Sequence, residues 1–320
     1  MHAVFLDKQT FSSFVDFNVI ESEVTKLSCY NMTQAEDVVG RCLDAEIIIT
    51  NKVLLTKEVL KQLPKLKLIC IAATGTNNVD INAAKSLNIA VTNVSGYAGT
   101  SVAQYVFAQI LSYFQQTEHH NNNTAQGLWS SSDTFCYHGN AITELAGKSL
   151  GIVGYGNLGQ AVEQIAKAFH MQVLISERPN ATSIRANRLS FEQVIQQADI
   201  LSLHCPQTPD TEQLINKHVL KQMKPSAMLV NTARGALIDN HALLQALQNK
   251  QIAFAALDVL EQEPPPANHP LLNSKLNNLK VTAHIAWASR EAQQRLINLL
   301  AENITSFQSG TALNRVDLET

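Results

Sequence analysis

The chain has 320 residues, of which 45% are hydrophobic and 16% are charged, and its formal net charge is -3. A chain of this length usually forms two domains, each with its own core. The isoelectric point near 6.4 gives no sign of nucleic acid or a membrane surface as a partner, so we expect a small-molecule ligand.

Cysteine usage indicates a reducing compartment. The cysteines are scattered, odd in number and never in CxxC spacing, which argues against a disulfide framework or a zinc site: Cys29, Cys42, Cys70, Cys136 and Cys205. The adjacent histidines His119 and His120 could suggest a metal ligand pair, but they are interpreted as a solvated pair, so no metal site is predicted.

The amino terminus shows no secretory signal, because MHAVFLDKQT has no basic segment followed by a long apolar run. The most apolar helix candidate, Ser101 to Phe114, is too short to span a bilayer and carries Gln104 and Gln109. We therefore expect a cytoplasmic protein without a membrane partner.

The first hundred residues alternate between strand and helix. Strands are predicted at 3–6, 46–50, 66–73 and 89–94, and helices at 35–43, 57–63 and 79–87. This alternation predicts a parallel sheet covered by helices. The loop Thr74 to Asn78 follows a strand, where open sheets of this kind bind ligands, but it can equally be an ordinary polar turn.

A domain boundary is predicted at the glycines of Ser95 to Gly99. The long helix that follows begins with a capping box, Ser101 to Gln104, with Thr100 as a competing cap. This helix is apolar almost all round, so we expect it to be buried between domains or subunits. Beyond it, the aromatic stretch Trp129 to Tyr137 is interpreted as an extended arm against a partner subunit, which predicts a homodimer.

A glycine motif follows at Leu150 to Gly159, LGIVGYGNLG. The apolar run predicts a strand, and Gly154, Gly156 and Gly159 match GxGxxG at the start of a helix. In that pattern the glycines permit a tight turn, a close approach of pyrophosphate and close packing of helix on strand. The sequence therefore predicts a dinucleotide-binding turn, although the motif alone also fits an unrelated glycine-rich turn.

The residues after this helix bear on the choice of cofactor. A second strand is predicted at Gln172 to Ser176, and Glu177 at its end can accept hydrogen bonds from an adenosine ribose. An acidic side chain there repels the extra phosphate of NADP, which favours NAD. The nearby arginines leave NADP possible because they can shield that phosphate: Arg178, Arg185 and Arg188.

The alternation then continues to the end of the chain. Strands are predicted at 200–204, 227–231, 253–257 and 279–283, and helices at 191–197, 217–223, 239–247 and 289–307. The last helix is expected to pack on the first domain.

Three charged residues follow strands of the predicted cofactor domain: Arg234, Glu263 and His284. An arginine can grip a carboxylate with two hydrogen bonds, and a glutamate beside a histidine favours the imidazolium form, a proton donor. Singly, they can be a surface ion-pair residue, a solvated charge and a core histidine. Together they suit reduction of a 2-keto acid.

The chain resembles the D-isomer-specific 2-hydroxyacid dehydrogenase family over essentially its whole length. The matching segments are GYGNLGQ, LHCPQTPDT, MKPSAMLVNTARG, DVLEQEPP and HIAWAS. Within the family it is most similar to the glycerate dehydrogenase or hydroxypyruvate reductase branch, with D-glycerate and hydroxypyruvate as first substrates and glyoxylate next.

The resemblance implies two doubly wound α/β domains, a Rossmann cofactor domain at 99–288 inserted in a flavodoxin-like substrate domain at 1–98, with a helix at 289–320 returning to it. It implies that Arg234 binds and polarises the substrate, while Glu263 pairs with His284, which exchanges the proton. Backbone N–H groups of Thr74 and Gly75 would hold the substrate carboxylate. The cofactor would lie on Gly154, Tyr155, Gly156, Asn157, Leu158, Gly159, Glu177, Cys205, Pro206, Thr232, Ala233, Arg234, Asp258 and His284.

Two positions depart from the family pattern, since Ala283 and Ser95 stand where prolines are usual. Both affect backbone stiffness and neither removes a reacting group. Two other functions stay open at this point: a nucleotide-sensing corepressor-like protein, and a formate dehydrogenase, against which the pairing of Glu263 with His284 argues.

Overall fold

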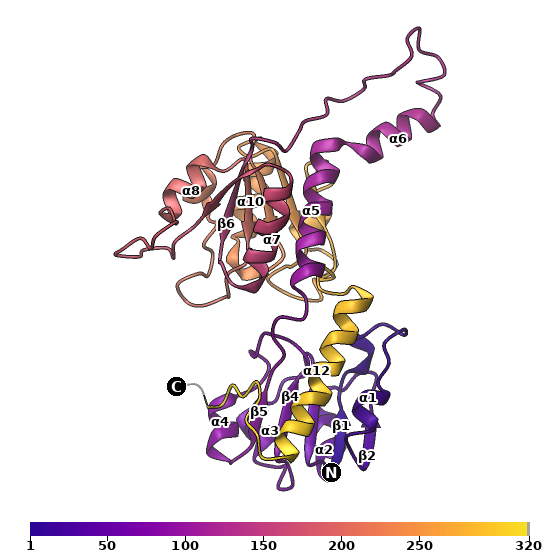
Figure 1. Ribbon diagram of the computed structural model, residues 1–320, viewed down its shortest axis with the longest axis vertical. Coiled ribbons are helices and arrows are strands. Elements are labelled where there is room, and N and C mark those ends of the chain that lie inside the picture. The colour runs from indigo at the N-terminus through magenta and orange to yellow at the C-terminus, as the bar shows by residue number, and fades with distance from the viewer. Residues whose placement is uncertain (319–320) are drawn as a thin grey trace. The chain divides into compact units, whose positions relative to one another are not determined.

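The computed structural model describes residues 1–318, and the chain forms two compact units (Figure 1). Unit 1 comprises Met1–Ala98 and Ala288–Thr320, and unit 2 comprises Gly99–Trp287. Each unit contains one parallel sheet with helices, so the expected α/β class is confirmed.

Unit 1 is built on a five-stranded sheet in the order β2-β1-β3-β4-β5, in which all neighbours are parallel. Its strands are β1 (His2–Phe5), β2 (Lys26–Cys29), β3 (Ile47–Thr50), β4 (Leu68–Ile71) and β5 (Ala90–Thr92). The central strands β3 and β4 are buried along their whole length, as their apolar runs predict. The edge strand β2 was not predicted, because its residues are exposed or only partly buried and form no apolar run.

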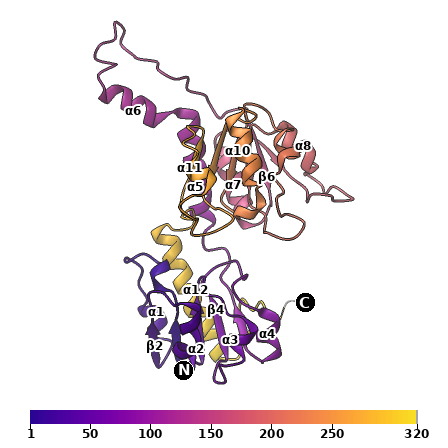
Figure 2. The same cartoon turned by 180° about the vertical axis from the view of Figure 1, so that it is seen from behind.

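Short helices accompany this sheet: α1 (Asn18–Glu21), α2 (Val38–Cys42), α3 (Lys57–Leu60) and α4 (Ile81–Ser86). The long C-terminal helix α12 (Arg290–Gln308) contacts α1 and β4, and both views show it lying along the sheet of unit 1 (Figure 2). Ser289 caps it by accepting a hydrogen bond from the N–H of Ala292.

Unit 2 contains a six-stranded parallel sheet in the order β11-β10-β9-β8-β6-β7. Its strands are β6 (Ser149–Val153), β7 (Gln172–Ile175), β8 (Ile200–Leu203), β9 (Met228–Asn231), β10 (Phe254–Leu257) and β11 (Leu279–Val281). From β6 the chain passes to β7 on one side and returns to β8 on the other. The strand order therefore reverses at β6, and ligands of open α/β sheets bind at the carboxyl end of such a position.

The helices of unit 2 fall close to their predicted positions, apart from α6 and the short helix α11, which were not predicted. They are α5 (Gly99–Gln115), α6 (Thr117–Ala125), α7 (Asn157–Ala168), α8 (Phe191–Gln197), α9 (Lys217–Leu220), α10 (Asn240–Gln248) and α11 (Pro270–Asn273). In the part of the chain that the structure describes, no helix is long and apolar enough to cross a membrane.

Helix α5 begins at Gly99, so the predicted capping box at Ser101 is wrong. The hydroxyl of Ser101 is buried inside the helix and donates to the carbonyl of Ala286 at 2.8 Å. This bond fixes the segment after β11 to the start of α5. The local Ser-x-x-Gln pattern could not show that a residue distant in sequence takes this hydroxyl.

The segment between α6 and β6 is an exposed arm, and both views show it extending away from the sheet of unit 2. Its aromatic side chains are exposed, with Phe135 at 91% and Trp129 at 52%. The Trp129 indole donates to the carbonyl of Phe135 at 3.0 Å, which folds the arm back locally.

Candidate active site

The glycine turn lies at the carboxyl end of β6 and leads into α7, as the sequence predicts. Gly154 has a φ of +94°, and a Cβ there would lie 2.4 Å from the backbone nitrogen of Cys205. A Cβ on Gly159 would lie 2.3 Å from the carbonyl oxygen of Gly154. Gly156 differs, because a Cβ there would meet nothing within 4 Å. Two glycines therefore serve packing, and the third leaves open space above the turn.

Neighbouring strand ends contribute polar atoms that have no hydrogen-bond partner within the described chain. These atoms are Nδ1 of His204, which follows β8, and the hydroxyl of Thr232, which follows β9. Both are buried without a hydrogen-bond partner among the described residues. Burial also raises the pKa of the Cys205 thiol to about 11, which keeps it neutral. An open glycine turn beside unsatisfied polar atoms fits a dinucleotide.

Glu177 follows β7, where the sequence predicts a ribose acceptor, but its side chain is only 4% exposed. Its carboxylate accepts hydrogen bonds from the Arg185 guanidinium and from the backbone N–H groups of Arg178 and Arg185. These bonds hold the pKa of Glu177 far below its usual range. Arg185, one of the arginines expected to shield a 2′-phosphate from this acid, is thus in direct contact with Glu177.

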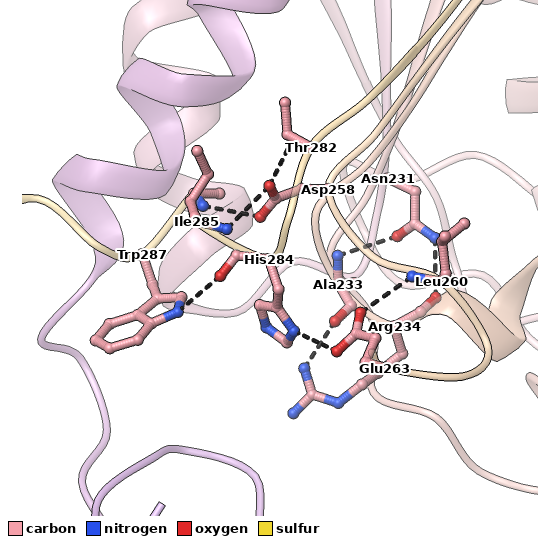
Figure 3. Close-up of polar contacts among 11 residues, drawn as sticks. Asn231, Ala233, Arg234, Asp258, Leu260, Glu263, Thr282, His284, Ile285 and Trp287 are labelled. Atoms are coloured by element: carbon pink, nitrogen blue, oxygen red, sulfur yellow. Dashed lines mark hydrogen bonds and ion pairs between the residues drawn. The ribbon is translucent and has the colours of Figure 1, made fainter. Parts of the chain in front are cut away.

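Arg234, Glu263 and His284 line one cavity of about 150 Å³ in unit 2. The Nδ1 atom of His284 lies 2.6 Å from a carboxylate oxygen of Glu263 (Figure 3). The other Glu263 oxygen accepts from the backbone N–H of Leu260 at 3.0 Å. The Arg234 guanidinium donates to the carbonyl of Ala233 at 2.7 Å and lies beside the Glu263–His284 pair. The three residues selected from the sequence therefore lie together.

The loop that carries His284 is held mainly by Asp258, which is 2% exposed. The backbone N–H of His284 donates to the carbonyl of Asp258 at 2.7 Å, and those of Ile285 and Ala286 donate to its carboxylate at 3.0 and 2.8 Å. The Trp287 indole N–H donates to the carbonyl of His284 at 3.0 Å. These bonds stabilise His284 at a φ of +54°, which non-glycine residues rarely adopt.

Two further residues belong to this support and were not predicted. The Tyr105 hydroxyl lies 2.6 Å from the Thr282 hydroxyl, which donates to the Asp258 carboxylate at 2.7 Å. Tyr105 is on α5, far from the other members in sequence. No local motif marks it, so only the fold reveals this contact.

Gly235 ends the segment MKPSAMLVNTARG, in the loop after β9. A Cβ on Gly235 would lie 1.9 Å from the backbone carbon of Leu260. The loop after β9 and the loop after β10 therefore touch through their backbones at this point. Only glycine permits this approach, which brings Arg234 close to Glu263.

Thr74 and Gly75 lie in unit 1, after the carboxyl end of β4. The Thr74 hydroxyl donates to the carbonyl of Val94 at 2.9 Å, and its own carbonyl accepts from the Asn93 side chain at 2.8 Å. The loop is thus fixed to the residues that follow β5. In residues 1–318 no group of three or more His, Cys, Asp or Glu side chains is placed to hold a metal ion.

The model of the D-isomer specific 2-hydroxyacid dehydrogenase NAD-binding domain matches residues 107–286. The chain belongs to this family. It is 40% identical to a glycerate dehydrogenase of Methylorubrum extorquens, over 98% of each chain. It is 36% identical to a hydroxypyruvate reductase of Blautia hydrogenotrophica, over 90% of this chain and 89% of the relative.

Among solved structures, the chain is similar to a D-lactate dehydrogenase from Aquifex aeolicus in complex with NAD and lactic acid. The TM-score is 0.83 and the identity 26%, with all of both chains covered. The family predicted from the sequence is confirmed, and the protein is an NAD-dependent oxidoreductase, with NADP as a possible cofactor.

Proposed function

We propose that the protein transfers a hydride between NAD(H) and a small D-2-hydroxy or 2-keto acid, with D-glycerate and hydroxypyruvate first and glyoxylate second. The observation that carries this proposal is the shared cavity of Arg234, Glu263 and His284. The names of the relatives from Methylorubrum extorquens and Blautia hydrogenotrophica support the choice of substrate.

Each of the three side chains has a distinct role in this proposal. Arg234 binds the substrate and polarises its carbonyl with a guanidinium that presents several N–H donors. Glu263 accepts the Nδ1–H of His284, so Nε2 is the nitrogen that exchanges a proton with the substrate oxygen. When bound, the nicotinamide supplies the hydride in reduction and accepts it in oxidation.

Other residues position the ligands. The turn from Tyr155 to Leu158 would hold the pyrophosphate, with Cys205, Pro206, Thr232, Ala233 and Asp258 along the cofactor. Backbone N–H groups of Thr74 and Gly75 would bind the substrate carboxylate. The open space at Gly156 supports the first assignment, since pyrophosphate must approach the backbone there.

Two other functions give different outcomes in one assay. Rapid oxidation of NADH with hydroxypyruvate supports the dehydrogenase. Tight NADH binding without turnover of hydroxypyruvate, glyoxylate or pyruvate would indicate a corepressor-like sensor, and oxidation of formate with NAD would indicate a formate dehydrogenase. The Glu263–His284 contact favours the first outcome. Reduction of a 2-keto acid adds a proton to the carbonyl oxygen, whereas oxidation of formate to CO2 involves no proton transfer at an oxygen.

We also propose that the protein is a cytoplasmic homodimer. Exposed aromatic residues on the arm, Phe135 and Trp129, support a partner subunit, because aromatic side chains gathered on one exposed segment are typical of interfaces. Scattered thiols without a disulfide pattern support the location. Sedimentation at micromolar concentration should give a dimer, and a monomer would contradict the proposal.

A further inference from the structure

Both carboxylate oxygens of Glu177 already accept two hydrogen bonds each from the protein. One carboxylate oxygen accepts from the N–H of Arg178 at 2.9 Å and from an Arg185 guanidinium nitrogen. The other accepts from the N–H and the Nε of Arg185, at 3.2 and 2.7 Å. With the side chain 4% exposed, binding a ribose hydroxyl would require breaking a bidentate, charge-assisted pair.

The surroundings of Glu177 carry an excess of positive charge. The guanidinium of Arg188 lies 4.0 Å from the carboxylate, and it donates to the carbonyl of Ser176 at 3.3 Å. Arg185 keeps 54% of its side chain exposed, and Arg178 is exposed as well. The Glu177 carboxylate thus faces the guanidinium groups of Arg185 and Arg188. With Arg178, the segment from Glu177 to Arg188 holds three arginines and one acid, an excess of two positive charges.

This cluster is continuous with the glycine turn. β7 pairs with β6 in parallel, so Glu177 and Gly154 follow neighbouring strand ends at the same edge of the sheet. The Arg188 guanidinium lies 5.7 Å from the centre of the Tyr155 ring, within the turn itself. In a Rossmann domain the adenosine ribose binds at the end of the second strand, which is the position of this cluster.

We propose that Arg185 and Arg188 form a subsite for the 2′-phosphate of NADP(H), with Glu177 as the residue that positions Arg185. A phosphate monoester carries about -1.5 to -2 charges at neutral pH, which matches the excess positive charge. The Glu177 carboxylate would otherwise accept the hydroxyl hydrogens of a bare ribose, but it already accepts hydrogen bonds from Arg178 and Arg185. The protein therefore binds NADPH more tightly than NADH, and the NAD-binding turn serves both cofactors.

The direct test is calorimetric binding of 2′,5′-ADP and 5′-AMP, which differ only in the phosphate. The unmodified protein should bind 2′,5′-ADP at least about tenfold more tightly, equivalent to one good charge-assisted hydrogen bond. Arg185→Ala should abolish most of this preference and leave 5′-AMP binding nearly unchanged. Lys221→Ala changes an exposed lysine that directly follows α9, so this variant serves as the charge control and should keep the preference.

Arg185→Lys covers the case in which Arg185→Ala does not fold, because it keeps a cation beside the buried acid but loses the two-pronged geometry. It should lose several-fold in affinity for 2′,5′-ADP. Equal binding of both nucleotides by the unmodified protein, or an undiminished preference in both Arg185 variants, would overturn the proposal.

The proposed 2′-phosphate subsite rests on the proposed dehydrogenase function only in that turnover would use the cofactor bound there. Experiments can therefore reject either proposal without rejecting the other. Preference for 2′,5′-ADP without turnover of any 2-keto acid would retain the subsite and reject the dehydrogenase. Turnover of hydroxypyruvate with NADH, together with no preference for 2′,5′-ADP, would reject the subsite alone.

Discussion

The hydroxyl groups of Tyr105 and Thr282 lie 2.6 Å apart and connect helix α5 to the loop that carries His284. The Thr282 hydroxyl donates a hydrogen bond to the Asp258 carboxylate at 2.7 Å. This carboxylate also accepts hydrogen bonds from the backbone N–H groups of Ile285 and Ala286. The loop is therefore stabilised by hydrogen bonds on both sides of Ala283, where the family usually has a proline.

Removing one member of this chain should misplace His284 without removing a reacting group. We predict that Thr282→Val lowers kcat about tenfold, because a buried hydrogen bond left unsatisfied costs about 1–3 kcal/mol. The KM for NADH should change less than threefold. Thr282→Ser keeps the hydroxyl and should restore most of kcat, whereas full kcat in the valine variant would show that the contact does not position the loop.

Two glycines of the site should respond in opposite ways to alanine. A Cβ on Gly235 would overlap the backbone of Leu260, so Gly235→Ala should lower the free energy of unfolding by roughly 2 kcal/mol or more. A Cβ on Gly156 would meet no atom within 4 Å, so Gly156→Ala should leave the free energy of unfolding unchanged. The added methyl group should obstruct the pyrophosphate and weaken NADH binding about tenfold or more. Denaturant titration and NADH fluorescence separate the two effects. Equal stability of both variants would contradict the assignment of Gly235.

His204 gives a prediction for pH. Burial lowers its pKa to about 4 from an ordinary 6.5, so the unfolded chain binds a proton that the folded chain does not between these values. The titration of His204 has no effect on the free energy of unfolding above pH 6.5, and it lowers that free energy by up to about 3 kcal/mol as the pH falls towards 4. Unfolding free energies of the unmodified protein and His204→Gln should therefore converge or cross as the pH is lowered over this range. A constant difference would exclude the titration of His204 as a cause.

Sequence patterns predicted the central parts of the fold well and its edges poorly. Strands β3, β4 and β8 are buried throughout, so their apolar runs are unambiguous. The residues of the edge strand β2 are exposed or only partly buried, and they form no apolar run. Short helices such as α11 contain too few residues to show a period.

Some residues of the candidate site could likewise be predicted from the sequence, and others could not. Arg234, Glu263 and His284 could be chosen because each follows a strand, and parallel strands bring their carboxyl ends to one edge. Contacts between distant segments could not be predicted, and Tyr105 on α5 is the clearest example. For Glu177 the position was predictable, but not its burial against Arg185, because the loop between them has no regular pattern.

The central claim is that His284 exchanges the proton in reduction of a 2-keto acid. The most direct measurement is kcat for hydroxypyruvate with NADH in His284→Gln, compared with His218→Gln, which changes an exposed histidine on α9. We predict a loss of about a hundredfold or more in the first variant, with NADH binding retained, and no loss in the second. A folded His284→Gln protein with full kcat would contradict the account.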